Sequence, residues 1–169
     1  MEGEIINKVA NSSLVVFDLE DYYPTEPRVL IDISQFLYEG FILKEKDFRT
    51  ALAATDWSIY QNQLVAITCT TDALLPSWAF MLVSSFVQPF AKLVVQGSLH
   101  QLDFVYYKQV IDGLDFSLYQ DKPVIIKGCS KKPIPEEGYV MATEKMMLFA
   151  RSIMFGEACS AVPIFKKKK

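Results

Sequence analysis

Strand and helix patterns alternate along most of the chain, and this alternation constrains the fold more than any other feature. Two runs, LVAITC at 64–69 and PVIIKG at 123–128, are almost continuously apolar, as expected for strands buried on both faces of a sheet. Each run lies between segments with the apolar spacing of helices. The pattern therefore predicts an α/β fold, with a mostly parallel or mixed sheet covered by helices on both faces.

The other elements follow from the same periodicity and from helix caps. Further strands are expected at 14–19, 28–33, 92–97 and, with Pro163 confining it to an edge, 160–165. Helices are expected at 4–10, 44–55, 72–87, 99–112 and 135–155. Asp72 is expected to cap the third of these helices.

A shift of 59 residues aligns 47–68 with 106–127 without a gap. The match includes polar positions, since DWSIYQ falls on DFSLYQ. A period of this length that occurs only twice is not that of a solenoid, so we interpret it as a duplicated βαβα unit, with halves at about 28–88 and 91–155. Two convergent helix–turn–strand segments are the alternative.

Size and composition fit one soluble domain, expected over 1–165. The chain has 169 residues, of which 51% are hydrophobic and 22% charged, and this excludes intrinsic disorder. The net charge of −3 gives no indication of a nucleic-acid partner. The four lysines at 166–169 are expected to form a solvated basic tail.

No targeting or membrane-spanning segment is expected. The N-terminus lacks the apolar core and cleavage site of a signal peptide. The uncharged stretch 73–91 contains two prolines and several polar residues, so a buried helix is preferred to a membrane span. Three cysteines match no small disulfide framework. We therefore expect a cytoplasmic protein with reduced thiols and no membrane partner.

The cysteines carry the scarce chemistry of the chain. Cys69 ends the first buried strand, and Cys129 ends its repeat equivalent, one position off the strict shift. Ligands of open α/β sheets bind at the carboxyl ends of strands, where a following helix favours a thiolate. Cys159 follows the last expected helix, whose length of about 30 Å would end near the opposite sheet edge unless the following loop folds back.

Three thiolates form a soft ligand set that suits zinc, iron or an iron–sulfur cluster. The predicted metal ligands are Cys69, Cys129 and Cys159, with a fourth position for Asp72, Glu157, His100 or water. Two alternatives stay open. The cysteines can be buried and inert, since no CxxC pair is present, or they can be reactive thiols without a metal.

The remaining candidates have ordinary structural interpretations. His100, the only histidine, lies one helical turn from Asp103 and is expected to be a hydrogen-bonded residue rather than the base of a cysteine nucleophile. Aromatic residues in the repeated turn are expected to seal the core, and methionines of the last helix indicate core packing or a dimer face. No Walker loop, GxGxxG or HExxH motif is present.

The segments KGCSKKPIPEEGYV and SIMFGEACSAVPIFKK resemble a bacterial family known as domain of unknown function 2480. The resemblance runs end to end and includes LKEKDFRTAL, DWSIYQ and CTTDALLPSWAFMLV. The family has no established activity. The resemblance implies that Cys69, Cys129, Cys159, Asp72 and Trp78 belong to the family pattern. It also implies a role in iron–sulfur cluster assembly or metal handling, because members tend to be encoded near that machinery.

We therefore predict a cytoplasmic, homodimeric accessory protein that presents a three-cysteine site to zinc, iron or an iron–sulfur assembly partner. No catalytic residue is assigned. Two other functions remain as alternatives: a small-molecule enzyme with a cysteine nucleophile at the strand ends, and a purely structural dimer.

Overall fold

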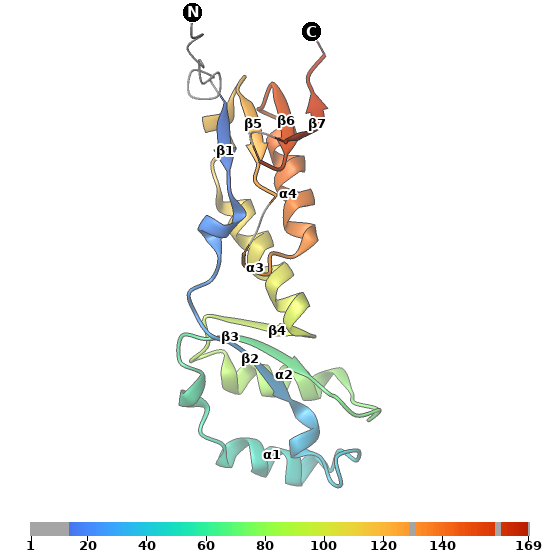
Figure 1. The fold of residues 1–169 in the computed structure, drawn as a ribbon. Coiled ribbons are helices and arrows are strands. Elements are labelled where there is room, and N and C mark those ends of the chain that lie inside the picture. Colours follow the sequence, from blue (N-terminus) through green and yellow to red (C-terminus); the bar gives the residue numbers. More distant parts are fainter. Residues whose placement is uncertain (1–13, 129–130, 158–159, 169) are drawn as a thin grey trace, which may run out of the picture. The chain divides into compact units, whose positions relative to one another are not determined.

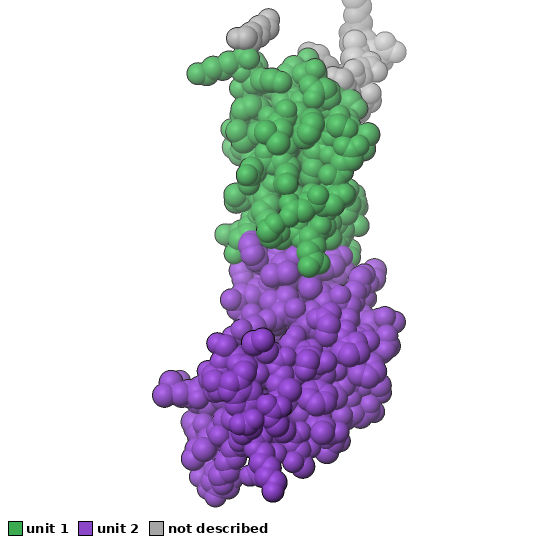
Figure 2. All heavy atoms as spheres, turned by 180° about the vertical axis from the view of Figure 1, so that it is seen from behind, with its two compact units in different colours: residues 1–23, 107–169 green, residues 24–106 purple. Residues whose placement is uncertain are grey.

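A computed structural model describes residues 14–128, 131–157 and 160–168 (Figure 1). They have an α/β fold in which most strands are parallel, as the sequence predicts. The chain divides into two compact units (Figure 2). Unit 1 contains the described parts of 1–23 and 107–169, and unit 2 is Pro24–Tyr106. Each unit has its own sheet, where the sequence pattern indicates one sheet for both halves.

Unit 2 contains a three-stranded parallel sheet and the helices that cover it. The strands, in the order β2-β3-β4, are β2 (Arg28–Asp32), β3 (Leu64–Thr68) and β4 (Leu93–Gln96). The helices are α1 (Glu45–Ala54), α2 (Ser77–Val87) and the first part of α3 (Leu99–Gly113), with short 3-10 turns η2 (Ile33–Phe36) and η3 (Trp57–Tyr60).

Both faces of β3 are buried, which explains its continuous apolar run. Successive side chains of a strand point to opposite faces. On one face Val65 and Ile67 belong to a core cluster with residues of α1 and α2. On the other face Leu64 and Ala66 pack with Leu102 of α3. Helices therefore cover both faces of this sheet, as predicted.

Unit 1 contains a four-stranded sheet that is parallel except at one edge. Its strands, in the order β1-β5-β6-β7, are β1 (Val15–Phe17), β5 (Pro123–Ile126), β6 (Ser152–Phe155) and β7 (Val162–Lys166). β7 is antiparallel to β6 and lies at the edge, where Pro163 is tolerated. The unit also contains the rest of α3, helix α4 (Glu136–Met147) and 3-10 turns η1 (Leu19–Tyr22) and η4 (Phe116–Tyr119).

The expected helix over 135–155 is wrong in its second half. α4 ends at Met147, and the chain turns back into β6. Ile153 pairs with Val124 of β5 and is fully buried, and the Arg151 N–H donates to the Lys122 carbonyl at 2.9 Å. Pairing with a distant strand therefore outweighs the local helical spacing of the apolar residues.

The same local geometry recurs in the two units at the 59-residue shift. Asn62 and Asp121, with φ of 58° and 56°, follow η3 and η4, and their N–H groups donate to the equivalent carbonyls of Phe90 and Phe149. β1 pairs with β5 as β2 pairs with β3. The first strand of unit 1 thus precedes unit 2 in the sequence, so the unit bounds differ from the expected halves 28–88 and 91–155.

Two helix expectations have different outcomes. The helix expected at 4–10 lies outside the described residues. Asp72 does not cap α2, because that helix begins at Ser77 and its N-cap is Pro76. Among the described residues, no side-chain hydrogen bond caps the first turn of this helix. Throughout the described ranges, every helix is too short or too polar to span a membrane.

Candidate functional site

Cys69 lies at the carboxyl edge of the unit 2 sheet, directly after β3, where the sequence predicts it. It is a free, half-buried thiol whose Sγ lies 3.4 Å from Thr71 Oγ1 and 3.6 Å from the Thr71 carbonyl. Thr71 Oγ1 in turn donates to the Gly40 carbonyl at 2.7 Å. A cavity of about 260 Å³ opens beside the thiol, with Phe80 and Gln96 in its lining. The thiol is therefore accessible to a small ligand or ion.

Asp32 ends β2 at the same edge and fixes the chain that follows Cys69. Its carboxylate accepts hydrogen bonds from Thr70 N (3.1 Å), Thr70 Oγ1 (2.5 Å) and Ser34 N (3.0 Å). Burial raises the pKa of Asp32, but these hydrogen bonds outweigh burial and lower the pKa to about 2. Asp32 therefore holds the loop as a carboxylate at neutral pH. No motif in the sequence singles out Asp32, although an aspartate at the end of an apolar strand is a visible signal.

Asp18 takes the equivalent position in unit 1, after β1. It accepts from Glu20 N at 2.9 Å and pairs with Lys127 Nζ at 2.5 Å. This hydrogen bond raises the pKa of Lys127, and the nearby carboxylates of Glu20 and Glu157 raise it further. The edge therefore gathers three carboxylates around one ammonium group. Glu20 also accepts from the N–H of Lys131, which ties the loop after β5 to this edge.

The ends of β5 and β6 lie side by side in unit 1. Gly156 N donates to the Ile126 carbonyl at 3.1 Å, and a Cβ added to Gly128 would lie 3.0 Å from Gly156 Cα. Cys129 directly follows Gly128, and Cys159 lies three residues after Gly156. Both thiols lie outside the described residues. The expectation that the last helix carries the chain to the opposite edge is wrong, because β6 brings it back to the carboxyl edge.

The other predicted ligands are not brought together among the described residues. No group of three or more His, Cys, Asp and Glu side chains suited to a metal occurs there. Asp72 is exposed in the loop before α2, and His100 is exposed in the first turn of α3. Asp103 forms a 2.7 Å ion pair with Arg28. Its carboxylate therefore connects the first part of α3 to the start of β2, within unit 2.

A model of the family described as "Protein of unknown function (DUF2480)" matches residues 3–167. No curated protein and no solved structure matches the chain. The match covers nearly the whole sequence, and its description assigns no activity.

Proposed function

The chain therefore belongs to the DUF2480 family, and from its own residues we propose that it is an accessory protein that binds zinc or iron through its cysteines. One observation carries the proposal: the strand ends that precede Cys129 and Cys159 converge at one edge of the unit 1 sheet. The two cysteines that follow these strand ends in the sequence would supply thiolates, which are the ligands that zinc and iron prefer.

One cation at this edge favours a thiolate. Lys131 follows the segment that contains Cys129, and a cation near a thiol favours its ionised form. The ammonium group of Lys127, in contrast, is paired with Asp18. The carboxylate of Glu157 acts on Lys127 and therefore lies at the same edge. A carboxylate is an acceptable additional ligand for zinc, so the donor set fits a site with two thiolates and one carboxylate.

Cys69 and Asp72 are the further ligands that the sequence predicts. Cys69 is accessible beside its cavity in unit 2, and Asp72 is exposed three residues later. Each is tested separately from the pair in unit 1. The expected partner is an iron–sulfur assembly protein, as the family resemblance implies. The site would present its bound metal or its sulfur ligands to that partner.

Metal content and thiol reactivity of the full chain test the proposal. The protein is purified without oxygen, its zinc and iron are measured by mass spectrometry, and the metal-free form is titrated with Zn²⁺. We expect about one metal per chain and protection of the bound thiols from a disulfide reagent. C129S and C159S should each weaken Zn²⁺ binding by more than about 100-fold, since each removes a direct ligand and loss of an outer-shell partner alone costs about 10- to 100-fold. C69S and D72N show which other residues are ligands.

The matched control is S160A, which changes a small polar residue beside Cys159 and removes no ligand. It should bind Zn²⁺ like the unmodified chain. The proposal would be overturned if neither the purified nor the Zn²⁺-titrated protein contained bound metal and all three thiols were equally reactive in both conditions. Rapid alkylation of a single cysteine in metal-free protein would instead favour an enzyme with a cysteine nucleophile.

A further inference from the structure

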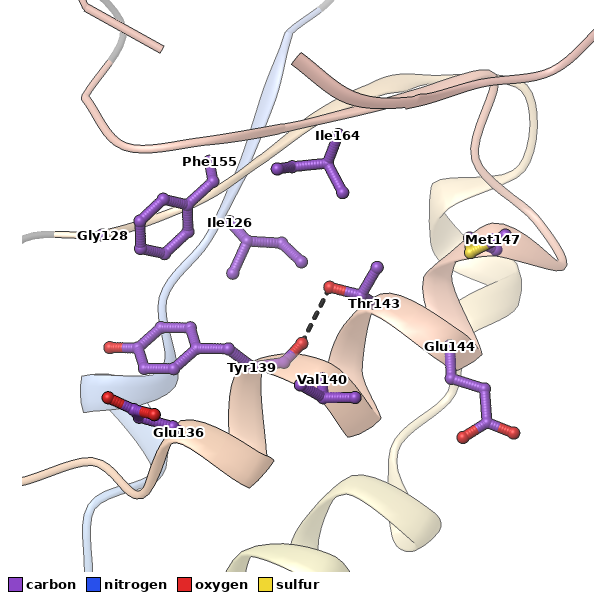
Figure 3. Close-up of a pocket in the computed structure, with 10 residues that line it drawn as sticks. All are labelled: Ile126, Gly128, Glu136, Tyr139, Val140, Thr143, Glu144, Met147, Phe155 and Ile164. Carbon is purple, nitrogen blue, oxygen red and sulfur yellow. Dashed lines mark hydrogen bonds between the residues drawn. The ribbon is translucent and has the colours of Figure 1, made fainter. Parts of the chain in front are cut away.

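An apolar groove of about 680 Å³ opens on unit 1 between α4 and β7 (Figure 3). Its floor is Ile126 of β5, and one end is formed by Tyr139 and Phe155, whose rings pack edge to face at 5.6 Å. Val140 and Met147 line the helix wall, and Ile164 lines the strand wall. Helix and strand thus present one continuous apolar surface.

The apolar side chains on the walls of this groove are exposed to solvent. Val140 is 69% exposed, Ile164 52% and Met147 42%. The apolar surface continues to Leu148 and Val162, which are also exposed. Contiguous apolar patches of this kind on soluble proteins mark interaction surfaces. Of the three methionines of α4, Met146 is in the core, Met141 is half-buried, and Met147 lines the groove.

The equivalent face of unit 2 lacks this character. A cavity of about 240 Å³ lies at the same place in the repeat, between α2 and β4. At the positions that match Met147 and Phe155, unit 2 has the polar residues Gln88 and Gln96, whereas Phe80 and Met81 match Tyr139 and Val140. No described strand follows β4 in the place of β7. The apolar groove is therefore a property of unit 1 and does not follow from the shared fold.

The charges beside the groove are opposite at its two ends. Glu136 begins α4 and lines the groove at the carboxyl edge of the sheet, near Gly128. β7 runs the other way from β6, so Lys166 lies opposite Ser152 at the amino edge, where Lys167 and Lys168 follow. Within the described ranges, none of Glu136, Lys166, Lys167 and Lys168 forms a side-chain ion pair. Glu144 also lines the groove, beside Met147, so the end with the three lysines carries one carboxylate as well (Figure 3).

A surface with an apolar centre, an acidic end and a basic end is complementary to itself after a two-fold rotation. Such self-complementarity is the requirement of an isologous dimer interface, in which each copy contributes the same patch. The rotation brings Glu136 of one copy to the Lys166 of the other and sets the two apolar centres against each other. We propose that the α4–β7 groove is the interface of a homodimer and that its occupant is the same surface of a second copy.

The mass of the full chain in solution tests this proposal. By light scattering and sedimentation, the unmodified protein should have twice the chain mass of 19.2 kDa at micromolar concentration. V140D places a charge at the centre of the interface and should weaken dimerisation by about 100-fold or more. The matched control is M81D, because Met81 occupies the same position of α2 in unit 2 and is 70% exposed. M81D should remain dimeric, and thermal unfolding confirms that both variants are folded.

A charge exchange tests the orientation of the two copies. E136K and K166E should each weaken the dimer by about tenfold, and the double variant should recover, because both charges of the intermolecular pair are exchanged. The proposal is overturned if the protein has the mass of a single chain at about 100 µM, a concentration well above the dissociation constants expected for a specific dimer. It is also overturned if V140D and M81D lose dimerisation equally, or if the double variant does not recover it. One other result would also overturn the proposal: a monomeric protein that co-purifies with an apolar small molecule, where the V140D variant does not bind that molecule.

Discussion

Asp32 joins the ends of β2 and β3 in unit 2 through its hydrogen bonds to Thr70. The same carboxylate caps η2 by accepting from Ser34 N. Asp18 has the corresponding task in unit 1, where its partner across the sheet edge is Lys127 instead of a threonine. An aspartate at the same position therefore organises both carboxyl edges. Its partner across the edge is a neutral threonine in unit 2 and a charged lysine in unit 1.

The lowered pKa of Asp32, about 2 against an ordinary 3.8, makes the stability of unit 2 depend on pH. A depressed folded-state pKa contributes stability above the unfolded value, and this is lost as pH falls from about 4 towards 2. Solvent exposure reduces the contribution to about 1 kcal/mol. D32N should therefore lower the free energy of unfolding by about 1 kcal/mol at pH 7, and the difference from the unmodified chain should disappear near pH 2.

Denaturant unfolding at pH 7, 4 and 2 measures this difference. D21N is the control, because Asp21 is an exposed aspartate whose side chain forms no hydrogen bond or ion pair with a described residue. Equal unfolding free energies for D32N and the unmodified protein at pH 7 would show that the Thr70 hydrogen bonds contribute nothing.

At the level of elements, two glycines in unit 1 stand in opposite environments. A Cβ on Gly138 of α4 would lie 3.7 Å from Leu19, which is an ordinary contact, and unit 2 has Ala79 at the equivalent position. A Cβ on Gly128 would lie 2.7 Å from Phe155 Cζ and 3.0 Å from Gly156 Cα, which is too close. The ends of β5 and β6 can therefore approach only because residue 128 has no side chain.

G138A should raise the free energy of unfolding by about 0.5–1 kcal/mol, because alanine is the better helix former. G128A should lower it by about 1–3 kcal/mol through overpacking at the strand ends. Thermal and denaturant unfolding of the two variants gives both values. The G128A/F155Q double variant should recover part of the loss, since unit 2 has Gln96 at that position. An unchanged or increased stability of G128A would contradict this account of the edge.

The sequence predicts the elements whose signal is local. β3 and β5 are predicted because the whole run is apolar, and Cys69 is correctly placed after β3. β6 is missed because its apolar residues continue the helical spacing of α4. Its strand state depends on pairing with β5, in the register of Ile153 with Val124, and local periodicity does not contain that information.

The candidate site, like the elements, is predicted only where the signal is local. The repeat shift places Gly128 opposite Cys69, so Cys129 falls one position late. A side chain does not fit at residue 128, because the ring of Phe155 occupies the space that it would need. The capping role expected of Asp72 fails because α2 begins at Ser77 and not directly after the aspartate. Neither fact is visible without the fold.

For the whole molecule, the two units differ in how the chain builds them. Unit 2 is one continuous segment, Pro24–Tyr106, with core clusters on both faces of its sheet. Unit 1 is assembled from two segments, because β1 and η1 precede unit 2 in the sequence. Phe17 and Leu19 of the first segment are 2% and 1% exposed, so the core of unit 1 depends on residues that are distant in sequence.

This arrangement predicts different behaviour for fragments of the chain. The fragment 24–106 should fold alone, with a cooperative denaturant transition and dispersed amide resonances, because both of its core clusters are complete. The fragment 107–169 should not fold alone, because it lacks Phe17 and Leu19 and leaves β5 without its neighbour β1. Fusing residues 14–23 to it through a flexible Gly/Ser linker should restore a cooperative transition. A non-cooperative 24–106 fragment, or a 107–169 fragment that folds unaided, would contradict the division into two units.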